Sequence, residues 1–125
     1  MRPLPSLHPD LRALTDVSDV EALVETSKSR PVLLFKHSVS CGTSAQALDE
    51  LHEHLEAAGA HDVQFAIVTV QSHRAVSNAL AQRLGIRHET PQALLIRDGQ
   101  VLWHASHFRV TAESIAAALA THASA

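Results

Sequence analysis

The chain has 125 residues, a formal net charge of −3 and an isoelectric point near 6.3. Hydrophobic residues make up 46% and charged residues 18% of it, which is typical of one folded globular domain and excludes a disordered chain. The net negative charge offers no basic surface for nucleic acid or anionic lipid, and no apolar run is long enough to span a membrane, so we expect neither nucleic acid nor membrane as a partner. We expect a single domain over residues 1–125.

The first half of the chain predicts a strand, a helix, a second strand and a second helix. Residues 1–10 contain three prolines and no periodicity, so we expect an irregular lead-in before a short strand near residues 11–14. The pattern Ser18-Asp-Val-Glu21 is typical of a capping box and opens a helix that ends near Ser29. The apolar run 32–35 predicts a buried, central strand, and apolar residues at helical spacing predict a helix over 43–58.

The second half continues this alternation and ends in a hairpin and a helix. Residues 63–70 predict another buried strand, and residues 73–84 a third helix. The runs 93–96 and 101–103 flank Asp98-Gly99, and Asp-Gly between two apolar runs predicts a β-hairpin. Thr111 is a suitable N-cap for a last helix that reaches His122, with Glu113 in its first turn.

These elements together predict an α/β fold of the thioredoxin-like type. We expect a central mixed β-sheet flanked by helices and completed by a C-terminal β-hairpin plus helix.

Cys41 is the only cysteine of the chain, so no intrachain disulfide can form, and a lone thiol favours a reducing compartment such as the cytoplasm. It falls between the strand over 32–35 and the start of the next helix. Free backbone amides and the helix dipole at such a position favour an anion. We therefore expect a reactive thiolate at Cys41, and not a buried inert thiol.

The local pattern Cys41-Gly-Thr-Ser44 is C-x-x-S. Ser44 cannot resolve a mixed disulfide as a second cysteine would, but it can donate a hydrogen bond to the Cys41 sulfur or simply satisfy amides in the first helical turn. A mixed disulfide at Cys41 should therefore persist until another thiol attacks it. His37 ends the preceding strand, and it could stabilise a thiolate, transfer a proton, or act only as a hydrogen-bonded loop histidine.

The runs Phe35-Lys-His-Ser-Val-Ser-Cys41-Gly-Thr-Ser44, His88-Glu-Thr-Pro91-Gln-Ala-Leu-Leu-Ile96 and Trp103-His-Ala-Ser-His107 resemble the YtxJ-type monothiol bacilliredoxins. The resemblance spans residues 11–120. It implies a thioredoxin fold in which Cys41 is the nucleophile and Pro91 a cis-proline facing it. It also implies that Thr90 offers backbone hydrogen bonds to the incoming disulfide, and that Gly42 and Thr43 contribute to the substrate-binding surface.

The same resemblance implies de-bacillithiolation as the activity, with bacillithiol as co-substrate, no bound cofactor, and S-bacillithiolated proteins as partners of a monomer or weak dimer. The Cys41-Gly42 dipeptide departs from the Cys-Pro or Cys-Ser of that family and is similar to monothiol glutaredoxins, which use glutathione and can share an iron–sulfur cluster between chains. An iron–sulfur carrier therefore stays an alternative, as does a thioredoxin-fold binding module with an incidental cysteine. Glutathione is the less favoured thiol.

The remaining polar and aromatic candidates receive ordinary interpretations. The ten histidines do not cluster at ligand spacing, so we expect no metal. Lys36, Arg74 and Arg87 are interpreted as solvated charges that could meet the acidic groups of a small thiol. Trp103 and Phe108 are interpreted as hairpin aromatics in the core or on the sheet, and less readily as part of a substrate groove.

Overall fold

A computed structural model describes residues 8–122, so most of the expected lead-in lies outside the described residues. Strands and helices alternate along the chain as the sequence predicts, and the strands extend one to three residues beyond the apolar runs at several ends. The elements are β1 (Leu11–Ala13), α1 (Ser18–Ser29), β2 (Val32–His37), α2 (Gly42–Ala58), β3 (Gln64–Thr69), α3 (Arg74–Leu84), β4 (Gln92–Arg97), β5 (Gln100–Ser106), a 3₁₀ turn η1 (His107–Arg109) and α4 (Ala112–His122). None of the helices within residues 8–122 has the length and hydropathy needed to cross a bilayer.

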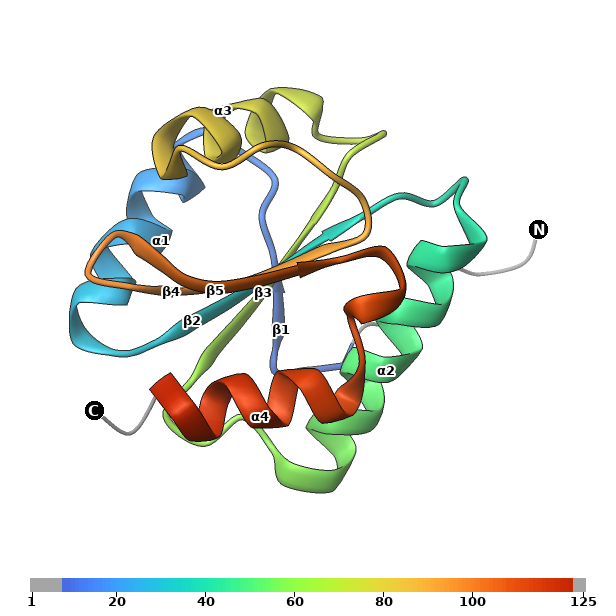
Figure 1. Cartoon of the computed structure of the whole chain (residues 1–125). Helices are drawn as coiled ribbons and strands as arrows, with labels where there is room; N and C mark the ends of the chain where they lie inside the picture. The colour runs from blue at the N-terminus through green and yellow to red at the C-terminus, as the bar shows by residue number, and fades with distance from the viewer. Residues whose placement is uncertain (1–7, 123–125) are drawn as a thin grey trace.

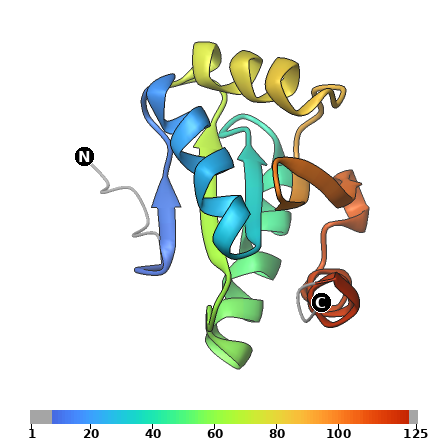
Figure 2. The ribbon, with the colours of Figure 1, turned by 90° about the vertical axis from the view of Figure 1, so that its left-hand side faces the viewer.

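The strands form one mixed sheet in the order β1-β3-β2-β4-β5. Strands β1 and β2 run parallel to β3, whereas β4 is antiparallel to both β2 and β5. Figures 1 and 2 show that α1 and α3 cover one face of this sheet and α2 and α4 the other, with β1 and β5 at its two edges. The expected mixed sheet with a C-terminal hairpin plus helix is therefore confirmed.

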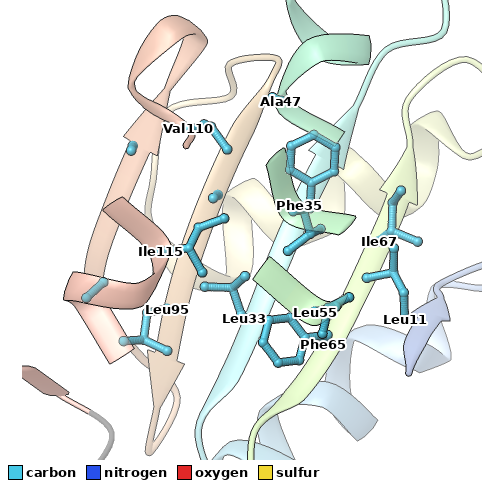
Figure 3. Close-up of a cluster of buried hydrophobic side chains, with 14 residues drawn as sticks. Leu11, Leu33, Phe35, Ala47, Leu55, Phe65, Ile67, Leu95, Val110 and Ile115 are labelled. Atoms are coloured by element: carbon cyan, nitrogen blue, oxygen red, sulfur yellow. The ribbon is translucent and has the colours of Figure 1, made fainter. Parts of the chain in front are cut away.

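Alternation along β2 divides the core between the two faces. Leu33 and Phe35 pack toward α2 and α4 in the cluster of Figure 3, while Val32 and Leu34 pack toward α1 and α3. All four side chains are fully buried, as expected for a central strand covered on both faces. This core fixes the carboxyl end of β2, from which the chain continues to Cys41.

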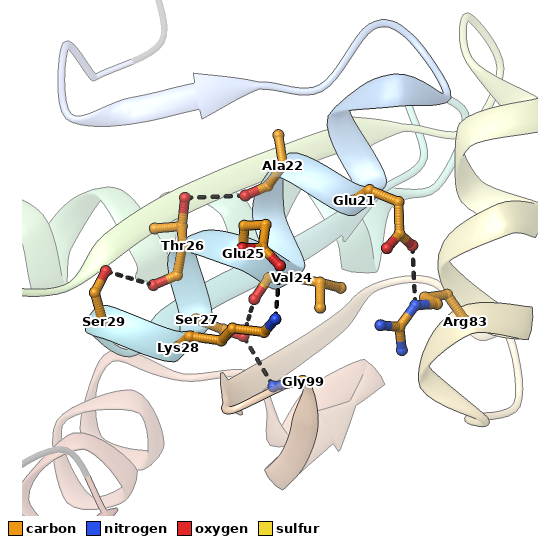
Figure 4. A network of polar contacts seen from close by, with 10 residues as sticks. All are labelled: Glu21, Ala22, Val24, Glu25, Thr26, Ser27, Lys28, Ser29, Arg83 and Gly99. Carbon is orange, nitrogen blue, oxygen red and sulfur yellow. Dashed lines mark hydrogen bonds and ion pairs between the residues drawn. The ribbon is translucent and has the colours of Figure 1, made fainter.

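The capping box predicted for α1 is wrong. The N-cap position is Val17, and the amide of Ser18 donates instead to the carboxylate of Asp16, at 3.0 Å. Glu21 turns away from the helix start and pairs with Arg83 of α3 at 2.9 Å (Figure 4). Asp16 takes the Ser18 amide that the box would have given to Glu21, and Glu21 joins two helices on the same face.

The C-terminal hairpin and helix form as predicted. Asp98 and Gly99 both have positive φ, 55° and 72°, as a two-residue hairpin loop requires. The amide of Gly99 donates to the hydroxyl of Ser27 in α1 at 2.9 Å (Figure 4). The amide of Asp98 donates to the carbonyl of Ser27 at 2.8 Å, so the hairpin is tied to the helix. Thr111 caps α4 by accepting a hydrogen bond from the amide of Ser114 at 3.0 Å.

Candidate active site

Cys41 is the N-cap residue of α2 and is only partly buried. Its backbone is extended, with φ −116° and ψ 119°, and its carbonyl accepts the amides of Ser44 and Ala45 at 3.1 Å each. The amides of Gly42 and Thr43, the first two of the helix, donate to no other group of residues 8–122. The thiol therefore lies at a helix N-terminus that retains free donors for a thiolate or a disulfide.

The segment before β4 lies beside the chain that leads to Cys41. Lys36 of β2 pairs with Gln92 of β4 in antiparallel register, so Pro91, one residue earlier, adjoins His37 at the carboxyl end of β2. The Thr90–Pro91 peptide bond is cis. Sheet pairing thus brings the Thr90–Pro91 segment, 49 to 50 positions further along the chain than Cys41, to the same end of the sheet as Cys41.

Gln71 holds the turn that precedes Cys41, a role that the sequence analysis missed. Its side-chain amide donates to the hydroxyls of Ser38 and Ser40, at 2.7 and 3.1 Å, and its carbonyl oxygen accepts the amide of Val39 at 3.1 Å. Gln71 follows β3, the parallel neighbour of β2, so the carboxyl ends of both strands lie at the same end of the sheet. A polar residue just beyond a parallel strand was the only available signal.

The contacts of Ser44 join α2 to the end of β2, whereas the sequence left open a hydrogen bond to the Cys41 sulfur or to amides of the first helical turn. Its side chain is fully buried, and Oγ accepts the amide of Ser38 at 2.9 Å and lies 2.8 Å from Nδ1 of His37. No hydrogen bond to the sulfur is formed among the described residues. The serine joins the first turn of α2 to the end of β2, because it lies on the helix face that packs against the sheet.

His37 is half-buried, stacks its ring on Phe35 with centroids 5.8 Å apart, and contacts Ser44. Burial lowers the pKa of its imidazole below the ordinary value of 6.5. At neutral pH the ring is therefore uncharged. Of the two chemical roles considered for this residue, proton transfer fits this state, while stabilisation of a thiolate by an imidazolium does not.

The interpretation of Lys36 as a solvated charge is wrong. Its side chain is fully buried on the face that packs against α1 and α3, and Nζ has no hydrogen-bond partner within the described chain. Burial lowers its pKa to about 8. The side-chain oxygen of Gln92, its partner across the sheet, is likewise buried and unpaired, whereas Arg74 and Arg87 are exposed as expected.

Two hollows flank the turn η1, which contributes to the lining of both. The smaller, of about 140 Å³, lies between α2 and η1 and is lined by Thr43, Gln46 and Phe108 among others. The larger, of about 420 Å³, is lined by Glu89, the end of β5 and the whole of η1. Phe108 contributes to both and is 75% exposed, so it is neither a core nor a sheet aromatic as interpreted from the sequence. Trp103 packs partly buried against the core cluster.

Within residues 8–122, no group of three or more histidine, cysteine or carboxylate side chains is arranged to hold a metal ion. His104 lies on β5 and His107 in η1, so the two do not share one strand.

Comparisons with known proteins agree with this architecture. The sequence model of the family described as monothiol bacilliredoxin BrxC matches residues 12–115. A solved structure of a protein proposed to be an oxidoreductase with a thioredoxin fold superposes with a TM-score of 0.75 at 28% identity, covering 86% of this chain and 92% of the other. Thioredoxin from Fasciola hepatica superposes with a TM-score of 0.70 at 18% identity, over 89% and 98% of the two chains. Thioredoxin f2 from Chlamydomonas reinhardtii gives 0.69 at 18% identity, over 90% and 95%. The thioredoxin-like fold is thereby confirmed.

Proposed function

The chain belongs to the monothiol bacilliredoxin family of thioredoxin-fold thiol oxidoreductases, and from this premise we propose that it removes bacillithiol from mixed disulfides on cytoplasmic proteins. The observation that carries the proposal is Cys41 itself. It is partly exposed at a helix N-cap, beside the Thr90–Pro91 segment, in a chain with no second cysteine.

The reaction takes place in two exchanges. The Cys41 thiolate attacks the bacillithiol sulfur of the mixed disulfide, a Cys41–bacillithiol disulfide forms, and the client leaves as a thiolate that takes a proton. A second bacillithiol, as thiolate, then attacks the bacillithiol sulfur bound to Cys41 and leaves as bacillithiol disulfide, which restores the Cys41 thiolate. The client sulfur is reduced and the sulfur of the second bacillithiol is oxidised, while the first bacillithiol stays at the disulfide level, so the electrons balance without a bound cofactor.

Neighbouring residues support these steps. The free amides of Gly42 and Thr43 suit the negative charge on sulfur, and the uncharged imidazole of His37 suits proton transfer to or from it. The backbone of Thr90, next to the end of β2, suits pairing with an extended client segment, as a strand edge does. Ser44 contributes by fixing His37 and the turn.

The test compares the wild type with Cys41→Ser and Ser44→Ala on an S-bacillithiolated protein, with bacillithiol as reductant. We expect Cys41→Ser to lose all turnover and Ser44→Ala to be slower, and mass spectrometry of the wild type to find bacillithiol on Cys41. Full activity of Cys41→Ser would contradict the mechanism. Faster turnover of the S-glutathionylated protein would contradict the choice of thiol, and visible absorbance after anaerobic purification would favour the iron–sulfur alternative.

A further inference from the structure

Phe108 is the most exposed large hydrophobic side chain of residues 8–122, although the chain around it is well anchored. The amide of His107 donates to the carbonyl of Pro91 at 2.9 Å, and Val110 is buried in the core. The amide of Ala112 donates to the carboxylate of Glu50 in α2 at 2.9 Å. The backbone of η1 is thus held between the Thr90–Pro91 segment and α2, and this anchored turn presents the Phe108 ring.

The position of this ring relates it to the reactive sulfur. Phe108 and Thr43 line the same hollow, and Thr43 is two residues after Cys41 at the start of α2. Figure 1 shows η1 beside the first turns of α2. A group linked to the Cys41 sulfur can therefore extend along the exposed start of α2 to reach Phe108.

The charges around η1 select the chemistry of such a group. Arg109 is exposed and forms no ion pair with any residue of the described chain, so its guanidinium is available to a carboxylate. In the larger hollow Glu89 is kept ionised, because a hydrogen bond from Ser106 and then the nearby His107 lower the pKa of its carboxyl. The surface thus offers one aromatic face, a cation and an anion within a hollow whose volume of about 420 Å³ suits a small molecule.

Resting on the proposed function, we infer that η1 is the subsite for the non-sulfur part of bacillithiol. This thiol carries an ammonium group on its cysteinyl part, a glucosamine ring and a malyl dicarboxylate. The sugar ring lies on the face of Phe108, Arg109 binds the malyl carboxylates, and Glu89 faces the ammonium group. Phe108 and Arg109 then determine which small thiol Cys41 accepts.

The test uses two small mixed disulfides with 5-thio-2-nitrobenzoate, one of bacillithiol and one of cysteine, which lacks the sugar and malate. In each, the Cys41 thiolate attacks the small-thiol sulfur, and thionitrobenzoate, the better leaving group, departs as a coloured thiolate. The ratio of the two second-order rate constants measures recognition of the sugar and malate. We expect the wild type to favour the bacillithiol probe, and Phe108→Ala and Arg109→Ala each to lower the ratio by about tenfold, as for the loss of one well-placed contact.

Val17→Ala is the matched control, because Val17 is an exposed apolar residue at the start of α1, on the sheet face opposite to α2 and α4, and should leave the ratio unchanged. The alkylation rate with iodoacetamide should be the same in all variants, which shows that the thiol itself is unaltered. An unchanged ratio in Phe108→Ala and Arg109→Ala would overturn the inference, even where both probes still react. A defect confined to S-bacillithiolated protein would overturn it as well and assign η1 to the polypeptide client. Failure of the proposed function is distinct, since the wild type would then not favour the bacillithiol probe.

Discussion

Replacing the buried Lys36 with methionine should stabilise the protein at neutral pH. Burial lowers the lysine pKa from 10.5 to about 8, and at ~1.4 kcal/mol for each pH unit the charged form weakens the fold by about 3 kcal/mol. Methionine keeps an unbranched stem of similar length and removes the unpaired ammonium group. The free energy of unfolding at pH 7 should therefore rise by an amount of this order.

The pH dependence identifies the cause. Between pH 8 and 10.5 the unfolded chain binds more protons at Lys36 than the folded chain does, so the stability of the wild type rises with pH through this window. The advantage of the methionine variant is full below about pH 8 and disappears above 10.5. The nearby His88 does not titrate in this window, because burial, and then the charges of Lys36 and Arg74, lower the pKa of its imidazole below 6.5.

The assay is urea unfolding of the wild type, Lys36→Met and Lys28→Met at pH 7 and again at pH 10.5. Lys28 is an exposed lysine of α1 whose ion pair with Glu25 contributes little, so its variant controls for the loss of one positive charge. A Lys36→Met protein that is less stable than the wild type at pH 7 would refute the argument. A gain of the same size at both pH values would attribute the effect to packing alone.

Three further changes test other parts of the structure. His54 is buried against Phe65, and burial lowers the pKa of its imidazole, so the wild type should lose stability as the pH falls below 6.5. In denaturation series from pH 7 to pH 5, His54→Leu should lose less stability than the wild type. Parallel curves for the two proteins would contradict this prediction. Gly42→Pro should raise the free energy of unfolding by about 0.4–1 kcal/mol, measured by calorimetry. Gly42 is the first residue of α2, Cys41 before it is already extended, and a Cβ at Gly42 would meet nothing within 4 Å. A lower melting temperature would show that the fold needs the Gly42 amide. Gln71→Ala should accelerate hydrogen exchange at the Val39 amide, because the side-chain oxygen that accepts this amide is lost. Gln71→Glu keeps such an oxygen, so exchange at Val39 should stay slow. Equal exchange rates in the two variants would show that Gln71 does not hold the turn before Cys41.

The fold could be predicted from the sequence because its determinants are local. The apolar run of β2 shows a strand buried on both faces, Asp98-Gly99 specifies a hairpin loop, and Gly59 and Gly85 stop two helices where the periodicity ends. The start of α1 was predicted less well. Competing aspartates beside a serine decide which group takes a free amide, and the pattern alone does not rank them.

Of the candidate site, the sequence and the family resemblance predicted only the positions of Cys41 and of the Thr90–Pro91 segment. Lys36 continues the alternation of Val32 and Leu34, so the period of the strand places it on a buried face, while its residue type suggests solvent. Gln71 acts on residues more than thirty positions away, and such a contact depends on strand order. Phe108 follows His107, whose φ of 58° lies in the left-handed region after β5, and histidine is only a weak sequence signal for that conformation.

The contacts of Ser44 show what the fourth position of C-x-x-S contributes. Its hydroxyl has one proton, and its oxygen already accepts the amide of Ser38. If the hydroxyl donates this proton to Nδ1 of His37, no proton is left for the Cys41 sulfur. If instead Nδ1 carries a hydrogen and donates it to the oxygen of Ser44, the hydroxyl proton is free for a hydrogen bond to the Cys41 sulfur. Because burial keeps the imidazole uncharged, the His37 tautomer decides between the two. The ¹⁵N chemical shifts of the His37 ring distinguish them, and a proton on Nε2 would mean that Ser44 links helix and strand with no direct role at sulfur.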